Sequence, residues 1–216
     1  RVKNNLQGVV GLLRQLVNKD RTLSAVLEKA ISQLMAMAVV HGVNGRELHD
    51  GVGVTEMVTE IAKSVERTTG IPVRVHSGAS EPTPRRVKAN DAVPIALVLN
   101  ELVLNAVKHR RVARDSAPAS VHVEGEEERV LISVTNEGAL SKQFDYEGGS
   151  GLGTGLELVR ALVPNEGAYM TFSRDNGCVT ARLTVSARLL ITTVNTLEQT
   201  RHEWDRRKRS YSDRRR

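Results

Sequence analysis

The sequence predicts an α+β protein in which a two-helix hairpin precedes an α/β sandwich with a mixed sheet. The hairpin is predicted by apolar residues that recur at alternating steps of four and three in residues 2–16 and again in 27–41, the spacing of a helix with one apolar face. The sandwich is predicted by helical and strand patterns that follow one another after a glycine-rich linker at 42–53.

The first two helices are expected to run antiparallel, because the linker 18–21 between them is short and polar. Each carries a stripe that matches the seam of a coiled coil. The stripes are Val2, Leu6, Val9, Leu13 and Leu16, and Leu27, Ile31, Leu34, Ala38 and His41. Pairing with a second copy through residues 1–41, to give a four-helix bundle, would cover both stripes. The alternative is that both helices pack on the sandwich of their own chain.

The sandwich is expected to mix helices and strands beyond residue 53. The expected elements are a helix over 54–69 with Met57, Val58, Ile61 and Val65 on one face, a strand over 72–76, a loop over 77–86, a helix over 91–110, strands over 120–124 and 129–135, a glycine-rich loop to about 154, a helix to 163, strands over 168–173 and 178–185, and a short helix within 189–200. Asp91 is expected to cap the long helix, with Pro94 in its first turn. Asn176 and Gly177 are expected to supply the positive φ angles of a tight turn.

Composition and charge exclude several classes of protein. Residues 201–216 hold eight basic and three acidic side chains, so this tail carries +5 of the net charge of +6. A nucleic-acid partner is therefore expected only at the tail, whose alternative is a solvated extension. The single Cys178 excludes an internal disulfide and favours a reducing, cytoplasmic location. The most apolar run, 92–99, is too short for a bilayer, so no membrane segment is expected.

A polar stripe interrupts the long apolar helix. Glu101, Asn105 and Lys108 are spaced four and three residues apart, and therefore share one face. An amide oxygen beside a carboxylate suits Mg²⁺, which takes few protein ligands, and a lysine can meet phosphate as a point charge. The alternative is the solvated outer face of an amphipathic helix.

Two further motifs follow along the chain. The stretch 148–159 places glycines directly before a helix, where backbone N–H groups can approach an anion. It lacks both the preceding strand of a Rossmann motif and the lysine of a Walker A loop. Asn136 ends a strand two residues before Gly138, so that its side chain could reach the edge of a ligand. The alternatives are a flexible surface loop and an ordinary strand end.

In this order and spacing, the three motifs resemble the ATP-binding domain of the GHKL superfamily, which has the Bergerat fold. The first residues, Arg1 to Gln7, resemble the segment just after the phosphoacceptor histidine in one subfamily of sensor histidine kinases, which commonly reads His-Arg-x-Lys-Asn-Asn-Leu-Gln. The resemblance implies a dimerisation and phosphotransfer hairpin (1–45), an ATP-binding domain (46–188) and a basic tail (189–216).

The resemblance also implies a function: transfer of the ATP γ-phosphate to a histidine, and onward to an aspartate of a response-regulator receiver domain. Asn105 would coordinate Mg²⁺, and Glu101 would sit near the γ-phosphate as a polarising or proton-accepting group. The other implied ATP contacts are Lys108, His109, Asn136, Gly138, Gly151, Leu152, Gly153, Thr154 and Gly155. Residues 138–153 would form a mobile lid.

The sequence departs from the family pattern at two places. The acceptor histidine would directly precede Arg1, so the chain as given is expected to bind ATP without phosphorylating itself. The family's adenine-reading aspartate is Asn136 here, and loss of the charge is expected to cost about 1–3 kcal/mol, a roughly ten- to hundredfold weaker affinity. A pseudokinase that scaffolds a response regulator without using ATP, and an ATPase without histidine transfer, are the alternatives.

Overall fold

The computed structural model describes residues 2–19, 24–43, 51–78, 85–111 and 117–191. Its elements, in chain order, are α1 (Val2–Lys19), α2 (Ser24–Val43), β1 (Val52–Gly53), α3 (Val54–Thr69), β2 (Val73–Ser77), β3 (Arg86–Val87), α4 (Ala89–Lys108), β4 (Ala119–Gly125), β5 (Arg129–Glu137), α5 (Thr154–Leu162), β6 (Ala168–Asp175), β7 (Cys178–Ser186) and β8 (Leu190–Ile191). The tail and the short helix expected within 189–200 lie largely outside the described residues.

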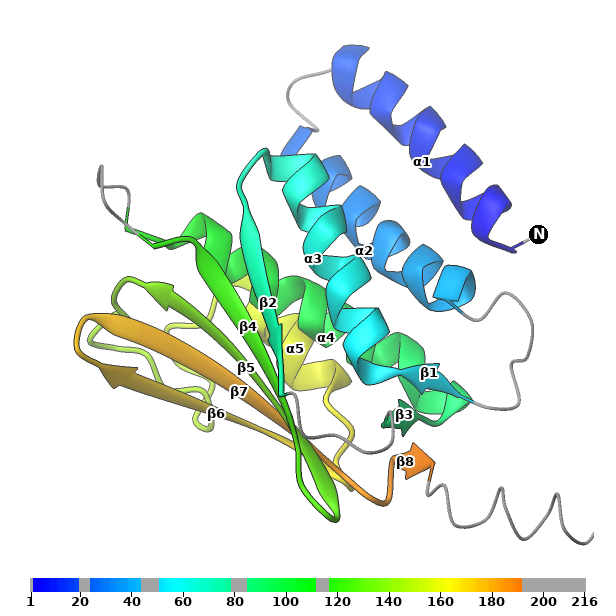
Figure 1. Ribbon diagram of the computed structural model, residues 1–216. Helices are drawn as coiled ribbons and strands as arrows, with labels where there is room; N and C mark the ends of the chain where they lie inside the picture. The colour runs from blue at the N-terminus through cyan, green and yellow to red at the C-terminus, as the bar shows by residue number, and fades with distance from the viewer. Residues whose placement is uncertain (1, 20–23, 44–50, 79–84, 112–116, 192–216) are drawn as a thin grey trace, which may run out of the picture.

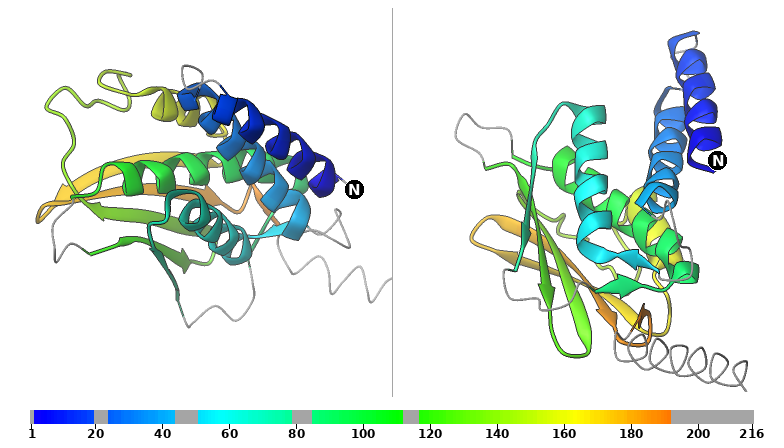
Figure 2. Two further views of the ribbon diagram at one scale, coloured as in Figure 1. Left: turned by 90° about the horizontal axis from the view of Figure 1, so that it is seen from above. Right: turned by 45° about the vertical axis from the view of Figure 1, so that its right-hand side comes forward.

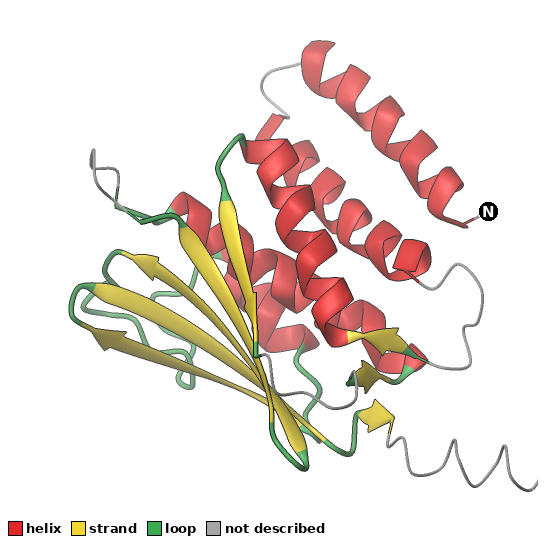
Figure 3. Cartoon of the chain, viewed as in Figure 1, coloured by secondary structure: helices red, strands yellow, loops and turns green. Residues whose placement is uncertain are grey.

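The main sheet has five strands in the order β2-β4-β5-β7-β6. The β2–β4 pair is parallel and the other pairs are antiparallel, so the sheet is mixed, as predicted. Along β5, residues 130, 132, 134 and 136 are buried and alternate with more exposed ones, because one face of the sheet is covered by the helices (Figures 1 and 3). The α+β prediction is therefore confirmed.

A second, smaller sheet was not anticipated from the sequence. Strands β1, β3 and β8 have two residues each and pair in the order β1-β3-β8. They join the start of α3, the start of α4 and the chain after β7. Helix α3 itself agrees with the prediction, since it spans 54–69 and buries Met57, Val58, Ile61 and Val65.

Helix α4 is the central helix, and its start was predicted wrongly. It begins at Ala89 after Lys88, so Asp91 lies inside the first turn and does not cap it, and Pro94 is the sixth helical residue. Pro94 lacks the N–H that would reach back to residue 90, a loss that packing must offset. Among the described residues, α4 alone has the length and hydropathy of a membrane span, and 67% of its apolar window is buried inside the fold, the pattern of a core helix.

The hairpin of α1 and α2 is antiparallel, and α2 lies between α1 and the sandwich (Figures 1 and 2). Helix α2 packs against α1 on one side and against α3 and α4 on the other. The predicted stripe of α1 divides: Leu6 and Leu13 are half-buried, whereas Val2, Val9 and Leu16 are exposed. The hypothesis that helices pack on their own chain thus holds for α2, and α1 keeps an uncovered apolar side.

The last hairpin confirms the turn that the sequence predicts. Strands β6 and β7 pair in register from Asp175 with Cys178 to Ala168 with Val185. The two connecting residues, Asn176 and Gly177, have φ angles of 48° and 76°, as a two-residue turn of this hand requires.

Candidate functional site

The three sequence motifs converge on one cavity of about 410 Å³. It lies between the C-terminal half of α4, the loop before α5, the start of α5 and strands β5, β6 and β7. The candidate residues that line it are Asn105, Lys108, His109, Asn136, Gly151, Gly153, Thr154 and Gly155. Its apolar wall is formed by Leu102, Ala106, Val134, Ala139, Leu140, Phe144, Leu156, Phe172, Val179 and Ala181. A cavity with an apolar wall and a few convergent polar groups is the usual form of a small-molecule site.

The polar stripe of α4 is not a solvated outer face. Glu101 is only 5% exposed, and Asn105 is half-buried, with an Nδ2 atom that is buried and has no hydrogen-bond partner. Lys108, at the end of the same stripe, is exposed. A buried amide without a partner costs free energy unless a ligand or water satisfies it. The stripe therefore leads from a buried carboxylate, through an unsatisfied amide, to an exposed cation at the cavity.

The structural reason for glycine differs from one position of the loop to the next. At Gly155 a Cβ would stand 2.7 Å from Oε2 of Glu101, so α5 approaches α4 closely there. At Gly151 the φ angle is +68°, and a Cβ would stand 2.7 Å from the carbonyl oxygen of Gln143. Gly153, the residue before α5, has nothing within 4 Å of its Cβ position. The start of α5 is consequently bare, with its backbone open to the cavity.

Three candidate residues do not line the cavity in this structure. Glu101 lies behind Gly155, Leu152 is half-buried in the loop, and Gly138 lies where β5 passes the end of α4. At Gly138 a Cβ would stand 2.8 Å from the carbonyl oxygen of His109. Gly138 therefore permits a close backbone approach that brings the strand end and the helix end together.

Asn136 stands at the strand end, as the sequence predicts. It is buried, and its Nδ2 donates to the carbonyl oxygen of Glu137 at 3.0 Å. This bond uses one of the two N–H groups of the amide and leaves its oxygen available to accept from a ligand. An amide oxygen accepts hydrogen bonds without the extra strength that a charge would give.

The loop expected as a lid has its own structure. Asp145 and Ser150 exchange two backbone hydrogen bonds of 2.9 Å each, and Nη2 of Arg160 on α5 donates to the carbonyl oxygen of Glu147 at 2.9 Å. Residues 145–150 thus form a small closed turn held to α5. The residues on either side of this turn, Phe144 and Gly151, line the cavity.

An aromatic cluster under the loop was missed by the sequence analysis. The rings of Phe144 and Tyr146 both contact Phe172 of β6, with centroids 5.0 Å apart in each pair. Burial raises the pKa of the Tyr146 hydroxyl, and the nearby Arg160 lowers it in part. The only available sequence signal was the scarcity of aromatic residues. The chain has only two phenylalanines, and both lie in this cluster.

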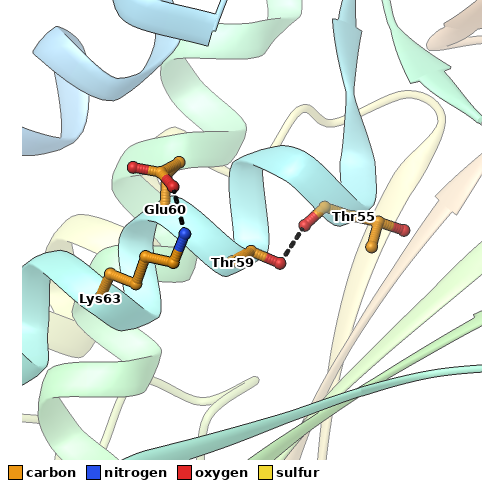
Figure 4. Close-up of polar contacts among 4 residues, drawn as sticks. All are labelled: Thr55, Thr59, Glu60 and Lys63. Carbon is orange, nitrogen blue, oxygen red and sulfur yellow. Dashed lines mark hydrogen bonds and ion pairs between the residues drawn. The ribbon is translucent and has the colours of Figure 1, made fainter.

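A second cavity, of about 850 Å³, lies between the hairpin and α3. Two of its polar side chains are paired and a third is bonded to the backbone: Lys63 pairs with Glu60 at 2.8 Å, and the Thr59 hydroxyl donates to the carbonyl oxygen of Thr55 at 2.7 Å (Figure 4). The hydrogen bond from Lys63 is the main reason that the pKa of Glu60 is lowered. None of the candidate residues lines this cavity, so the smaller cavity is the better candidate site.

Two family models match the chain. Residues 90–189 match the model of the histidine kinase-, DNA gyrase B- and HSP90-like ATPases, and residues 1–69 match a histidine kinase model. The sensor histidine kinase PdtaS of Mycobacterium tuberculosis (strain H37Rv) is 29% identical over 177 residues, which cover 77% of this chain and 33% of that protein. PdtaS of Mycolicibacterium smegmatis is 26% identical over 173 residues, covering 77% and 34%. The chain thus spans about one third of the length of these curated relatives.

Solved histidine kinases share the fold. The histidine kinase domain of the blue-light activated histidine kinase from Erythrobacter litoralis EL346 superposes with a TM-score of 0.61 at 18% identity, over 87% of this chain and 93% of that chain. The histidine kinase AdeS of Acinetobacter baumannii gives a TM-score of 0.51 at 16% identity, over 86% and 93%. At these identities the similarity concerns the fold alone.

Proposed function

This chain belongs to the sensor histidine kinases, and we propose that it binds ATP in the 410 Å³ cavity and carries the γ-phosphate to a histidine. The family match at 90–189 implies ATP binding. The onward step that we propose is transfer to the aspartate of a response-regulator receiver domain. The observation that carries the proposal is the convergence of Asn105, Asn136 and Gly153 on one cavity.

The cavity suggests a division of roles. We assign the adenine to the apolar wall, with the amide oxygen of Asn136 as acceptor for its exocyclic amine. We assign the phosphates to the backbone N–H groups around Gly151, Gly153 and Gly155, the Thr154 hydroxyl, and the side chains of Lys108 and His109 at the cavity. Catalysis would then consist mostly of positioning and charge neutralisation.

Asn105 fits the proposed magnesium site. Its amide atoms Nδ2 and Oδ1 stand 3.5 and 3.6 Å from the Cβ position of residue 155, so the amide can turn its oxygen toward the cavity without a large movement. Mg²⁺ keeps most of its waters and needs few protein oxygens. Asn105 would be a residue that holds Mg²⁺, and the bound ion would supply neutralisation of the phosphate charge.

The arrangement of the chain supports a division of labour that we also propose. Residues 1–45 would be the dimerisation and phosphotransfer hairpin, 46–188 the ATP-binding domain, and 189–216 a basic tail. Homodimerisation through residues 1–41 is supported by the exposed apolar residues of α1, and a receiver domain would dock on the hairpin. Cytoplasmic location is proposed from the free thiol of Cys178.

A pseudokinase scaffold is the second candidate, and Asn136 is the residue that favours it. Its amide already donates to Glu137, and it offers adenine a neutral acceptor where the family has a charged one. The buried Nδ2 of Asn105, which has no hydrogen-bond partner, favours the kinase, since a scaffold would gain nothing from an unsatisfied amide donor.

The first test is titration calorimetry with Mg-ATP. Wild type is expected to bind, and Asn136→Asp is expected to bind roughly ten- to hundredfold more tightly, because a charged acceptor replaces a neutral one. Asn105→Ala is expected to lose most of the affinity, whereas Asn5→Ala, at an exposed position of α1, is the matched control that should not. Absence of heat for both wild type and Asn136→Asp would falsify the proposal and leave the scaffold.

A further inference from the structure

Helix α2 of the hairpin is hydrogen-bonded to two consecutive residues of α4. Nδ2 of Asn100 donates to Oγ of Ser32 at 2.8 Å, and Nε2 of Gln33 donates to Oε1 of Glu101 at 3.4 Å. Asn100 and Glu101 are 2% and 5% exposed. Because buried polar groups cannot turn to water for their bonds, these two contacts matter more than surface ones.

The Glu101 carboxylate has a close neighbour at each of its two oxygens. Its Oε1 accepts the hydrogen bond from Gln33, and its Oε2 lies 2.7 Å from the position that a Cβ on residue 155 would take. Gly155 lines the nucleotide cavity, and Asn105, one helical turn after Glu101, lines it too. Glu101 is thus a junction between the hairpin and the start of α5, directly behind the cavity wall.

A carboxylate in this place has few ways to be oriented. The absence of a side chain at Gly155 leaves room for Oε2, but glycine offers no side-chain donor to hold it. Among the described residues, the side chain that donates a hydrogen bond to the Glu101 carboxylate is Gln33, which bonds Oε1. The orientation of Glu101 therefore depends on a residue of the hairpin. The bond between Ser32 of α2 and Asn100, the residue before Glu101 on α4, keeps the hairpin in place.

We propose that Gln33 is a positioning residue of the nucleotide site: it holds Glu101 in the orientation that leaves Oε2 at Gly155, and Ser32 anchors α2 beside it. The inference rests on the proposed function of the cavity. It makes the docking of the hairpin and the placement of Glu101 one linked event, because α2 cannot leave α4 without releasing the carboxylate. Gln33 does not line the cavity, so it acts through Glu101 alone.

The linkage predicts a specific kinetic pattern for Gln33→Leu. In the chain with a histidine added ahead of Arg1, turnover of labelled Mg-ATP, counted as released plus protein-bound phosphate, should fall about tenfold, since a misplaced catalytic group loses rate steeply. The dissociation constant of Mg-ATP should stay within about twofold, because the cavity wall is intact. Gln33→Lys, which keeps a long side-chain donor, should restore turnover, and Gln7→Leu on α1 is the matched control.

A double-mutant cycle decides whether Gln33 works through Glu101. In a Glu101→Gln background, Gln33→Leu should cause no further loss of turnover. Equal turnover in wild type and Gln33→Leu, a tenfold weaker Mg-ATP affinity, or losses that add up with Glu101→Gln would each overturn the inference while leaving the proposed function standing. If wild type itself binds no Mg-ATP, the proposed function fails, and the inference fails with it.

Discussion

At the residue scale, one close approach beside the candidate site joins Gly155 of α5 and Glu101 of α4. Both sit where two helices meet, and the missing Cβ of one makes room for the carboxylate of the other. Alanine normally favours a helix by about 1 kcal/mol over glycine. At residue 155, this gain is opposed by a 2.7 Å contact between the added Cβ and the buried Oε2 of Glu101.

We therefore predict that Gly155→Ala harms the protein, although it adds a helix former to the first turn of α5. The added methyl must push the Glu101 carboxylate out of its place, so thermal stability should fall and Mg-ATP affinity should drop about tenfold. Gly153→Ala is the matched control for stability, because its Cβ position is open and its φ of −87° suits any residue. Equal melting temperatures for the two variants would contradict this account of Gly155.

Single residues show what sequence reasoning could and could not reach. The spacing of Glu101, Asn105 and Lys108 was enough to predict a shared face, because helix periodicity is local. It could not reveal that Glu101 is buried behind Gly155, or that Gln33 contacts it from 68 residues away, because these facts depend on how α2 packs. The cap of α4 was predicted at Asp91 since acidic residues favour helix starts, but pairing of β3 two residues earlier fixes the start at Ala89.

At the scale of elements, the loop expected to be a lid is held by aromatic contacts as well as by its closed turn at 145–150. Tyr146 packs on Phe172, and its hydroxyl has a pKa raised mainly by burial. Between the ordinary tyrosine value of about 10 and this raised value, the unfolded chain has lost the proton that the folded chain retains. Stability must then fall as the pH rises above about 10, because the unfolded state binds fewer protons.

This gives a prediction for the lid. Tyr146→Phe keeps the contact with Phe172 and removes the ionisable hydroxyl, so its melting temperature should fall less than that of wild type between pH 9 and pH 11. Tyr146→Ala removes the contact and should lower the melting temperature at both pH values. If the melting temperature of Tyr146→Phe falls as much as that of wild type between pH 9 and pH 11, the hydroxyl of Tyr146 does not cause the loss of stability.

The elements themselves were largely predictable, and the reason is physical. Helix α3 and the β6–β7 turn carry strong local signals, a 3.6-residue period and an Asn-Gly pair, and both were found. Strands β1, β3 and β8 have two residues each, too few for any period to appear. They exist because three segments distant in sequence meet at the ends of α3 and α4, which only tertiary structure decides.

At the scale of the whole molecule, the hairpin has one side that the chain does not cover. Helix α1 packs on α2, yet Leu12 and Leu16 are 64% and 51% exposed. Val2 and Val9 are exposed on the same helix. Val26 is exposed at the start of α2, the end of the hairpin at which the two helices are connected. Aligned apolar side chains of this size are typical of a surface that meets a partner. The outermost place of α1 leaves this surface accessible (Figure 2).

We predict that this surface is the interface of a homodimer, in which two hairpins form four helices. Sedimentation should show a dimer whose population depends on concentration. The double variant Leu12→Glu with Leu16→Glu should weaken dimerisation at least about a hundredfold, because burying each leucine contributes roughly 1.5–3 kcal/mol. Tyr169→Glu, at an exposed aromatic of β6 across the molecule (Figure 1), should leave the dimer intact. A monomer at all concentrations, or a dimer broken equally by Tyr169→Glu, would place the interface elsewhere and leave the apolar side of α1 for the receiver domain.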